Sequence, residues 1–75
     1  MKEFDIILLC ERIKELRKEA GLIQIELAEE LGMKQNTISQ YESGTYCPSV
    51  DVVFKLCIAL RTTSDYLLGL DEIIM

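Results

Sequence analysis

The sequence predicts an all-α domain of five short helices, and three observations support this prediction. Apolar residues recur at spacings of three and four along most of the chain, which is the period of an amphipathic helix. Glycines at positions 21, 32, 44 and 69 stand where these helices are expected to end. The 75 residues include a single proline and four glycines, which excludes a long linker. We therefore expect one compact domain spanning residues 1–75.

The first helix is expected to begin near Asp5 and to end at Gly21. Aspartate is a favourable N-cap residue, and glycine is favoured just after a helix because it tolerates a positive φ. The predicted core face of this helix consists of Ile6, Leu9, Ile13, Leu16 and Ala20. Ile7 and Leu8 lie off that stripe, so the pattern assigns them no partner.

Residues 24–43, QIELAEELGMKQNTISQYES, predict two short helices joined by a tight turn. The second helix is expected over Gln24–Leu31 and the third over Gln35–Glu42. Gly32 supplies the positive φ of the turn, and Ala28 is small enough for the third helix to cross close above it. These features specify a helix-turn-helix, a motif whose second helix enters the major groove of DNA.

Two further helices complete the prediction. Pro48-Ser49 opens the fourth helix, with Ser49 as its N-cap, and Thr63 caps a short fifth helix that stops before Gly69. The residues of the fourth helix expected to face inward are Val50, Val53, Leu56, Cys57 and Leu60. The fifth helix contains Tyr66, Leu67 and Leu68. Because all these helices are short, packing between them must supply most of the stability.

The charge of the chain is unevenly distributed. The formal net charge is −5, which argues against binding nucleic acid through bulk electrostatics alone. The second helix and the tail after Thr62 each carry three acidic residues and no basic one. Residues 32–50 contain only Lys34 and Glu42 as charged residues and sum to zero. A binding face on the third helix would therefore be neutral to mildly basic on an acidic body.

Composition excludes several classes of function. Cys10, Cys47 and Cys57 are odd in number and lack CxxC spacing, and the chain has no histidine, so we expect reduced thiols and no metal site. No apolar run is long enough for a signal peptide or a membrane span, and we expect a cytoplasmic protein without membrane contact. With no nucleotide-binding glycine loop and no paired-carboxylate cleft, we expect no enzyme activity, no cofactor and no small-molecule ligand.

Five landmarks resemble those of the phage repressor/Cro-like (Xre-type) family of helix-turn-helix DNA-binding proteins. They are ERIKELRKEAGL at 11–22, QIELAEELG at 24–32, TISQYESG at 37–44, Pro48-Ser49 and DYLLG at 65–69. The resemblance implies a five-helix lambda repressor-like domain acting as a sequence-specific transcriptional regulator, with repression favoured over activation although the sequence does not fix the sign of regulation. Phage or mobile-element repressors and restriction-modification controller proteins both fit, and the sequence does not separate them.

The resemblance also implies which residues would meet DNA. Bases would be contacted from the outward face of the third helix by Gln35, Asn36, Ser39 and Gln40. Glutamine and asparagine amides suit bidentate pairing with adenine. Phosphates would be contacted by Arg17, Gln24, Lys34, Thr37, Thr45 and Tyr46.

In the family, an arginine of the first helix pairs with a glutamate of the third, and Arg17 and Glu42 occupy those positions. The alternative is two unrelated surface charges, which would contribute well under ~1 kcal/mol to stability.

The chain departs from the family at four places. Ile23 and Lys34 stand where Ser, Thr or Asn usually caps the second and third helices, and loss of such a cap costs about 1 kcal/mol. Glu26 can return a hydrogen bond to the backbone N–H of Ile23, and Lys34 could reach a phosphate. The loop 45–47 replaces a commonly basic stretch, and Arg61 replaces the glycine that usually ends the fourth helix. These departures affect DNA affinity more than the fold.

A DNA-binding domain of this size with few phosphate contacts would bind DNA weakly as a monomer. We therefore expect a homodimer on a pseudo-palindromic operator, with half-sites about one helical turn apart. Its surface is expected among apolar residues outside the predicted core, namely Val52, Ile58, Ile73 and Ile74. The alternative function is a protein-interaction module that keeps the scaffold but binds DNA weakly or not at all.

Overall fold

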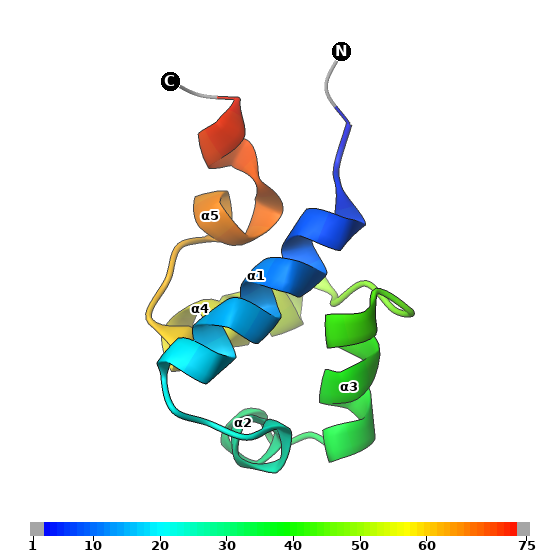
Figure 1. The fold of residues 1–75 in the computed structure, drawn as a ribbon, viewed down its shortest axis with the longest axis vertical. Coiled ribbons are helices and arrows are strands. Elements are labelled where there is room, and N and C mark those ends of the chain that lie inside the picture. Colours follow the sequence, from blue (N-terminus) through cyan, green and yellow to red (C-terminus); the bar gives the residue numbers. More distant parts are fainter. Residues whose placement is uncertain (1–2, 74–75) are drawn as a thin grey trace.

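The chain folds into five α-helices followed by a short 3-10 turn, as Figure 1 shows. The structure is a computed structural model and describes residues 3–73. The elements are α1 (Ile6–Glu19), α2 (Gln24–Leu31), α3 (Gln35–Ser43), α4 (Val50–Leu60), α5 (Ser64–Leu68) and the 3-10 turn η1 (Leu70–Glu72). Residues 3–73 contain no strand, which confirms the predicted all-α class. The turn η1 was not predicted.

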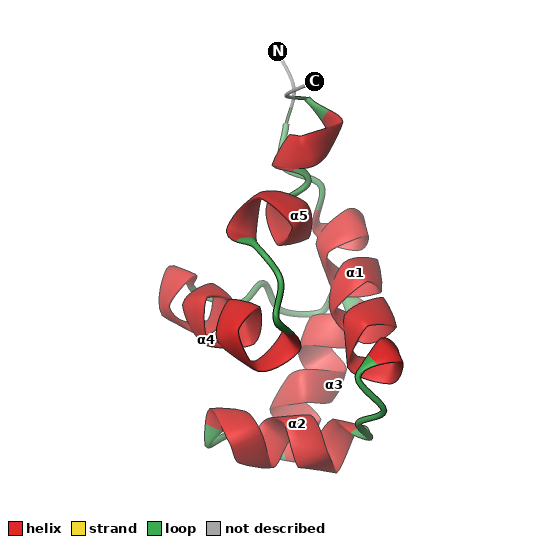
Figure 2. Cartoon of the chain, turned by 90° about the vertical axis from the view of Figure 1, so that its left-hand side faces the viewer, coloured by secondary structure: helices red, strands yellow, loops and turns green. Residues whose placement is uncertain are grey.

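α1 crosses the middle of the molecule and contacts α3, α4 and α5, while α2 packs against α3 and α4. Figures 1 and 2 show α2 and the start of α3 at one end, and α5 with η1 at the other, beside the start of α1. α3 and α4 lie on separate sides of the molecule. The largest fully buried side chains come from all five helices: Leu9, Ile13, Leu27, Ile38, Leu56 and Leu67.

The predicted caps set the ends of the helices. Asp5 accepts the N–H groups of Ile7 and Leu8 at the start of α1. Ser49 and Thr63 likewise each accept one N–H at the starts of α4 and α5. These bonds satisfy donors that have no partner within the helix.

Arg61 ends α4 in the left-handed conformation, with φ of +54°. The other positive-φ positions of the described chain are all glycines. The N–H of Arg61 bonds back to the Ile58 carbonyl, which closes the last turn of the helix. A residue with a Cβ in this conformation costs roughly 1–2 kcal/mol, so the fold tolerates strain where the sequence lacks a glycine.

Two apolar predictions for α4 were wrong. Val52, predicted on the dimer surface, is buried at 7% exposure, whereas Val50, predicted inside, is 88% exposed. The buried row of α4 runs through Val52, Leu56 and Leu60, which are four residues apart and so share one side of the helix. Val50 begins a second row that faces solvent. The two valines have the same chemistry, so only the packing distinguishes them.

The other predictions for apolar residues had mixed outcomes. In α1, Leu9 and Ile13 are buried as predicted, but Ala20 is exposed because it follows the last helical residue. Ile58 and Ile73 are exposed at 65% and 47%, which leaves both available for the predicted dimer surface. Ile74 lies outside the described residues.

Candidate nucleic-acid interface

α3 turns a polar side outward and an apolar side inward, as its sequence spacing predicts. Ile38 is fully buried against the core. Gln35 and Asn36 are exposed, while Ser39 and Gln40 are half-buried on the flank of the helix. The four side chains predicted to meet base edges therefore all reach the surface of a single helix.

The turn between α2 and α3 has the predicted geometry. Gly32 adopts φ of +67° and ψ of +35°, in the left-handed region. The N–H of Met33 donates to the carbonyl of Ala28 at 2.8 Å, and Ala28 itself is 2% exposed. The small side chain and the positive φ together let α3 leave α2 abruptly and pack back against it.

The predicted ion pair between Arg17 and Glu42 is present and buried. Arg17 Nε donates to Glu42 Oε2 at 2.6 Å and Nη2 donates to Oε1 at 3.0 Å, so the pair is bidentate. Arg17 Nη1 also donates to the carbonyl of Leu22 at 2.7 Å. The hydrogen bonds to Glu42 raise the pKa of the guanidinium. This one side chain thus ties α1 to α3 and to the loop before α2.

Burial changes the role that we assign to Arg17. Its side chain is 9% exposed and that of Glu42 is 3% exposed. Little of the guanidinium is therefore left for the phosphate contact expected from the sequence. We treat Arg17 as a positioning residue for α3.

Gln24 extends this pair to the surface. Its Nε2 donates to Glu42 Oε1 at 3.1 Å, and its Oε1 accepts from Gln35 Nε2 at 2.8 Å. A carboxylate only accepts hydrogen bonds, so Glu42 fixes which end of the Gln24 amide faces Gln35. Gln35 must then donate, and it keeps its own Oε1 and a second N–H for other partners. A chain of four side chains therefore runs from Arg17 in the core to the exposed start of α3.

The sequence reasoning missed both bonds of Gln24. It treated Gln24 as a phosphate contact at the start of α2, and its side-chain amide is instead already engaged on both atoms. Gln24 is 18 residues from Glu42 and 11 from Gln35, so no helical spacing connects them. The pairing becomes visible only when α2 and α3 are placed together.

The remaining predicted phosphate contacts lie at both ends of α3. Lys34 is exposed and precedes the helix without a capping side-chain bond, and Thr37 is half-buried in the first turn. Thr45 and Tyr46 are exposed in the loop after the helix. Their N–H groups donate to the carbonyl of Gln40 at 3.0 and 3.4 Å, which holds the loop on the end of α3.

The only charge that α3 and its flanking loops expose is positive. Residues 32–50 contain only Lys34 and Glu42 as charged residues, and Glu42 is buried against Arg17. The one charge that this segment presents to solvent is therefore that of Lys34. The exposed acidic groups of α2, which are Glu26, Glu29 and Glu30, lie on the neighbouring helix. Phosphates are therefore favoured beside α3 rather than along α2.

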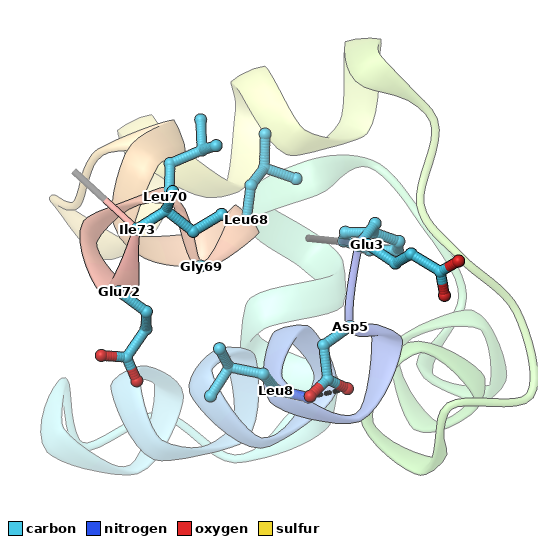
Figure 3. A pocket seen from close by; sticks show the side chains of 9 residues that line it. Glu3, Asp5, Leu8, Leu68, Gly69, Leu70, Glu72 and Ile73 are labelled. Atoms are coloured by element: carbon cyan, nitrogen blue, oxygen red, sulfur yellow. Dashed lines mark hydrogen bonds between the residues drawn. The ribbon is translucent and has the colours of Figure 1, made fainter. Parts of the chain in front are cut away.

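A separate hollow of about 480 Å³ lies between the start of α1 and the C-terminal turn. Figure 3 shows Leu68, Gly69 and Leu70 on one side of it and Leu8 on the other. Glu3, Asp5 and Glu72 also line this hollow, so its charge disfavours phosphate. It lies at the end of the molecule away from the start of α3.

Within residues 3–73, no cluster of three or more His, Cys, Asp or Glu side chains has a geometry for holding a metal ion. No helix in that range combines the length and hydropathy needed to cross a membrane.

Comparison with known proteins places the chain in a family. The helix-turn-helix family HTH_3 matches residues 13–67. The chain is similar to the HTH-type transcriptional regulator ImmR of Bacillus subtilis, with 42% identity over 65 residues, covering 87% of this chain and 51% of ImmR. It is also similar to the antitoxin PezA of Streptococcus pneumoniae, with 30% identity, covering 89% of this chain and 42% of PezA. The chain thus spans about half the length of these two relatives.

Solved structures show the same fold. The P22 c2 repressor, crystallised with a synthetic operator, superposes with a TM-score of 0.78 at 34% identity, covering 81% of this chain and 92% of that one. The restriction-modification controller protein C.AhdI of Aeromonas hydrophila superposes with a TM-score of 0.78 at 30% identity, covering 84% and 96%. Because the family match and these likenesses span most of the chain, it belongs to the Cro/C1-type helix-turn-helix family, a non-enzymatic class of DNA-binding transcriptional regulators with a lambda repressor-like fold.

Proposed function

We propose that this chain binds a specific operator in double-stranded DNA and represses transcription there, with α3 in the major groove. Gln35, Asn36, Ser39 and Gln40 contact base edges in this proposal. The observation that carries it is the side-chain relay from Arg17 through Glu42 and Gln24 to Gln35. A base-reading amide that is already oriented loses less rotamer freedom on binding than a free one.

The backbone contacts of this complex come from the two ends of α3 and from the start of α2. Lys34, Thr37, Thr45 and Tyr46 donate to phosphates from side chains, and Gln24 contributes its backbone N–H at the start of α2. The capping positions of α2 and α3, Ile23 and Lys34, make no side-chain cap bond. The first N–H groups of α3 are therefore suited to hold a phosphate, whereas at α2 the Glu26 carboxylate already accepts the N–H of Ile23 at 2.9 Å.

The proposed active form is a homodimer on a pseudo-palindromic site. A single α3 with four base-contacting side chains and one exposed lysine offers few contacts, and two copies on one duplex multiply the affinity through their effective concentration. The P22 c2 repressor was crystallised with an operator and SinR with DNA, and both resemble this chain above 30% identity. Such a role requires a cytoplasmic location, where the DNA is accessible.

A second candidate is a protein-interaction module on the same scaffold. The net charge of −5 and the exposed acidic residues of α2 favour it, because both oppose approach to DNA. The loop 45–47 adds no charge to offset them.

Selection of bound duplexes from a random pool separates the two candidates. For the proposed function, we expect enrichment of a site with two-fold symmetry, and an affinity for it that falls steeply as salt increases. Random duplex of the same length serves as the control. If no duplex is retained even at low salt, the interaction module replaces the DNA-binding proposal.

A further inference from the structure

A row of large apolar side chains lies on the solvent side of α4. Val50, Phe54 and Ile58 are spaced four residues apart, which places them along one side of the helix. They are 88%, 67% and 65% exposed. The core does not require them, because α4 already packs inward through the row of Val52 and Leu56. A row of large exposed apolar side chains of this kind is suited to contact with another molecule.

The same side of the molecule is hollowed beside this row. A groove of about 610 Å³ borders Phe54 and is lined by Phe4, Pro48, Val53, Cys57 and Leu68, among others. Ser64 is the polar side chain in its lining. A protruding aromatic ring from another molecule would find apolar walls there.

Charge indicates what kind of molecule fits this surface. α4 carries Asp51 and Lys55, whose charges cancel, although the chain as a whole is at −5. α2 carries three glutamates and no basic residue, so two copies meeting there would repel each other. Identical acidic molecules associate most readily through a face with no net charge. The α4 row is such a face.

We propose that a second copy of this chain docks on α4, with the two α4 helices antiparallel across a two-fold axis at Phe54. Phe54 then meets its equivalent in the second copy, and Val50 of each copy faces Ile58 of the other. Lys55 of each copy approaches Asp51 of the other at the rim. The surface is thus self-complementary, as a two-fold interface requires.

This arrangement rests on the homodimer of the proposed function and specifies its surface. α4 and α3 lie on separate sides of the molecule, as Figures 1 and 2 show, so contact through α4 leaves the polar side of α3 open. The interface differs from the one expected from the sequence, because Val52 is buried and Val50 and Phe54 take its place.

Sedimentation equilibrium of the free protein tests this interface without DNA. Phe54→Glu and Phe54→Lys should each raise the dimer dissociation constant by roughly thirtyfold or more, because each places like charges on the two-fold axis. An equimolar mixture of the two variants should form dimers again, since glutamate then faces lysine. Ile7→Glu is the control, because Ile7 is also a large apolar residue, 63% exposed, but belongs to α1 and not to the α4 row, and this change should leave the mass unchanged. Far-ultraviolet circular dichroism spectra should match the wild type for all three variants, which shows that each variant still folds; the melting temperature of the Phe54 variants should fall only as far as loss of the dimer requires.

Several outcomes would overturn the interface. A wild-type chain that stays monomeric at the highest soluble concentration would do so, as would a dimer that survives both Phe54 variants. If the equimolar mixture of Phe54→Glu and Phe54→Lys stays monomeric, residue 54 does not lie on the two-fold axis of the dimer. These readouts are independent of the proposed function. A chain that dimerises as described but retains no duplex refutes DNA binding alone, whereas a monomer that binds duplex refutes this interface and the proposed homodimer but leaves DNA binding by α3 in place.

Discussion

Arg12 and Arg17 lie on the same helix, and each ties a different part of the chain to α1. Arg17 holds α3 through Glu42, and both side chains are nearly inaccessible, at 9% and 3% exposure. Arg12 holds the C-terminal turn through Asp71 at 2.6 Å and Glu72 at 3.4 Å, and these carboxylates are 40% and 61% exposed. The first pair is shielded from water on both sides, whereas in the second only the carboxylates are open to water, since the Arg12 side chain is 12% exposed.

Arg12 has more varied partners than Arg17, but its carboxylate partners are more exposed to solvent. Its guanidinium lies 4.0 Å from the centre of the Tyr66 ring and donates to the Tyr66 carbonyl. The hydroxyl of Tyr66 donates to Glu15 at 2.8 Å, and that hydrogen bond raises the pKa of Tyr66. The hydrogen bond to Asp71 raises the pKa of Arg12. The two arginine side chains are about equally enclosed, at 12% and 9% exposure, so the comparison turns on the exposure of their carboxylate partners rather than on the number of partners.

The largest effect is expected from Arg17→Met. This change leaves Glu42 buried without its cation, and breaking a buried pair from one side costs about 3–5 kcal/mol. Denaturation by urea, monitored by circular dichroism, measures the loss. The double variant Arg17→Met with Glu42→Leu should recover most of the stability, since no charge is then stranded. If the free energy of unfolding of Arg17→Met lies within ~1 kcal/mol of the wild-type value, the pair does not stabilise the fold as a buried pair would.

Arg61→Gly tests a third arginine, which affects stability through its left-handed backbone conformation rather than through its charge. Glycine adopts the left-handed conformation without strain, so this substitution should stabilise the domain by about 1 kcal/mol, less the entropy that glycine adds to the unfolded chain. The melting temperature reports the change. A destabilised variant would mean that the Arg61 side chain makes a contribution larger than the strain.

Arg12→Met should cost far less than Arg17→Met, about 1 kcal/mol, because its carboxylate partners remain hydrated. High salt should shrink this cost further, whereas the cost of Arg17→Met should change little, since a buried pair is poorly screened. Parallel urea titrations at low and high salt compare the two variants directly. Equal salt dependence for both would contradict the distinction drawn between them.

Sequence reasoning predicted the features that depend on local chemistry. Asp5, Ser49 and Thr63 cap helices, and Gly32 turns the chain, because their effects act within a few residues. The pair of Arg17 and Glu42 was predicted only through the family resemblance, since 25 residues separate the two.

Other features depend on how the helices are placed, and the pattern could not provide them. Val50 and Val52 are chemically identical and two residues apart, so composition could not say which is buried. The bonds of Gln24 and of Arg12 join segments that meet only in the folded chain. In the candidate site, the outward residues of α3 were predictable from helical spacing, but the relay that orients Gln35 was not.

The most direct test of the account is the effect of Gln35→Ala on binding to the selected operator and to single-base variants of it. Gln35 is oriented by its hydrogen bond to Gln24 and contacts a base in the proposed complex, so its loss should cost about 1–3 kcal/mol on the operator and relax preference at one base position. Lys34→Ala is the control and should weaken binding to all sequences alike while flattening the salt slope. If Gln35→Ala instead weakens every sequence equally, α3 does not read bases through its amides.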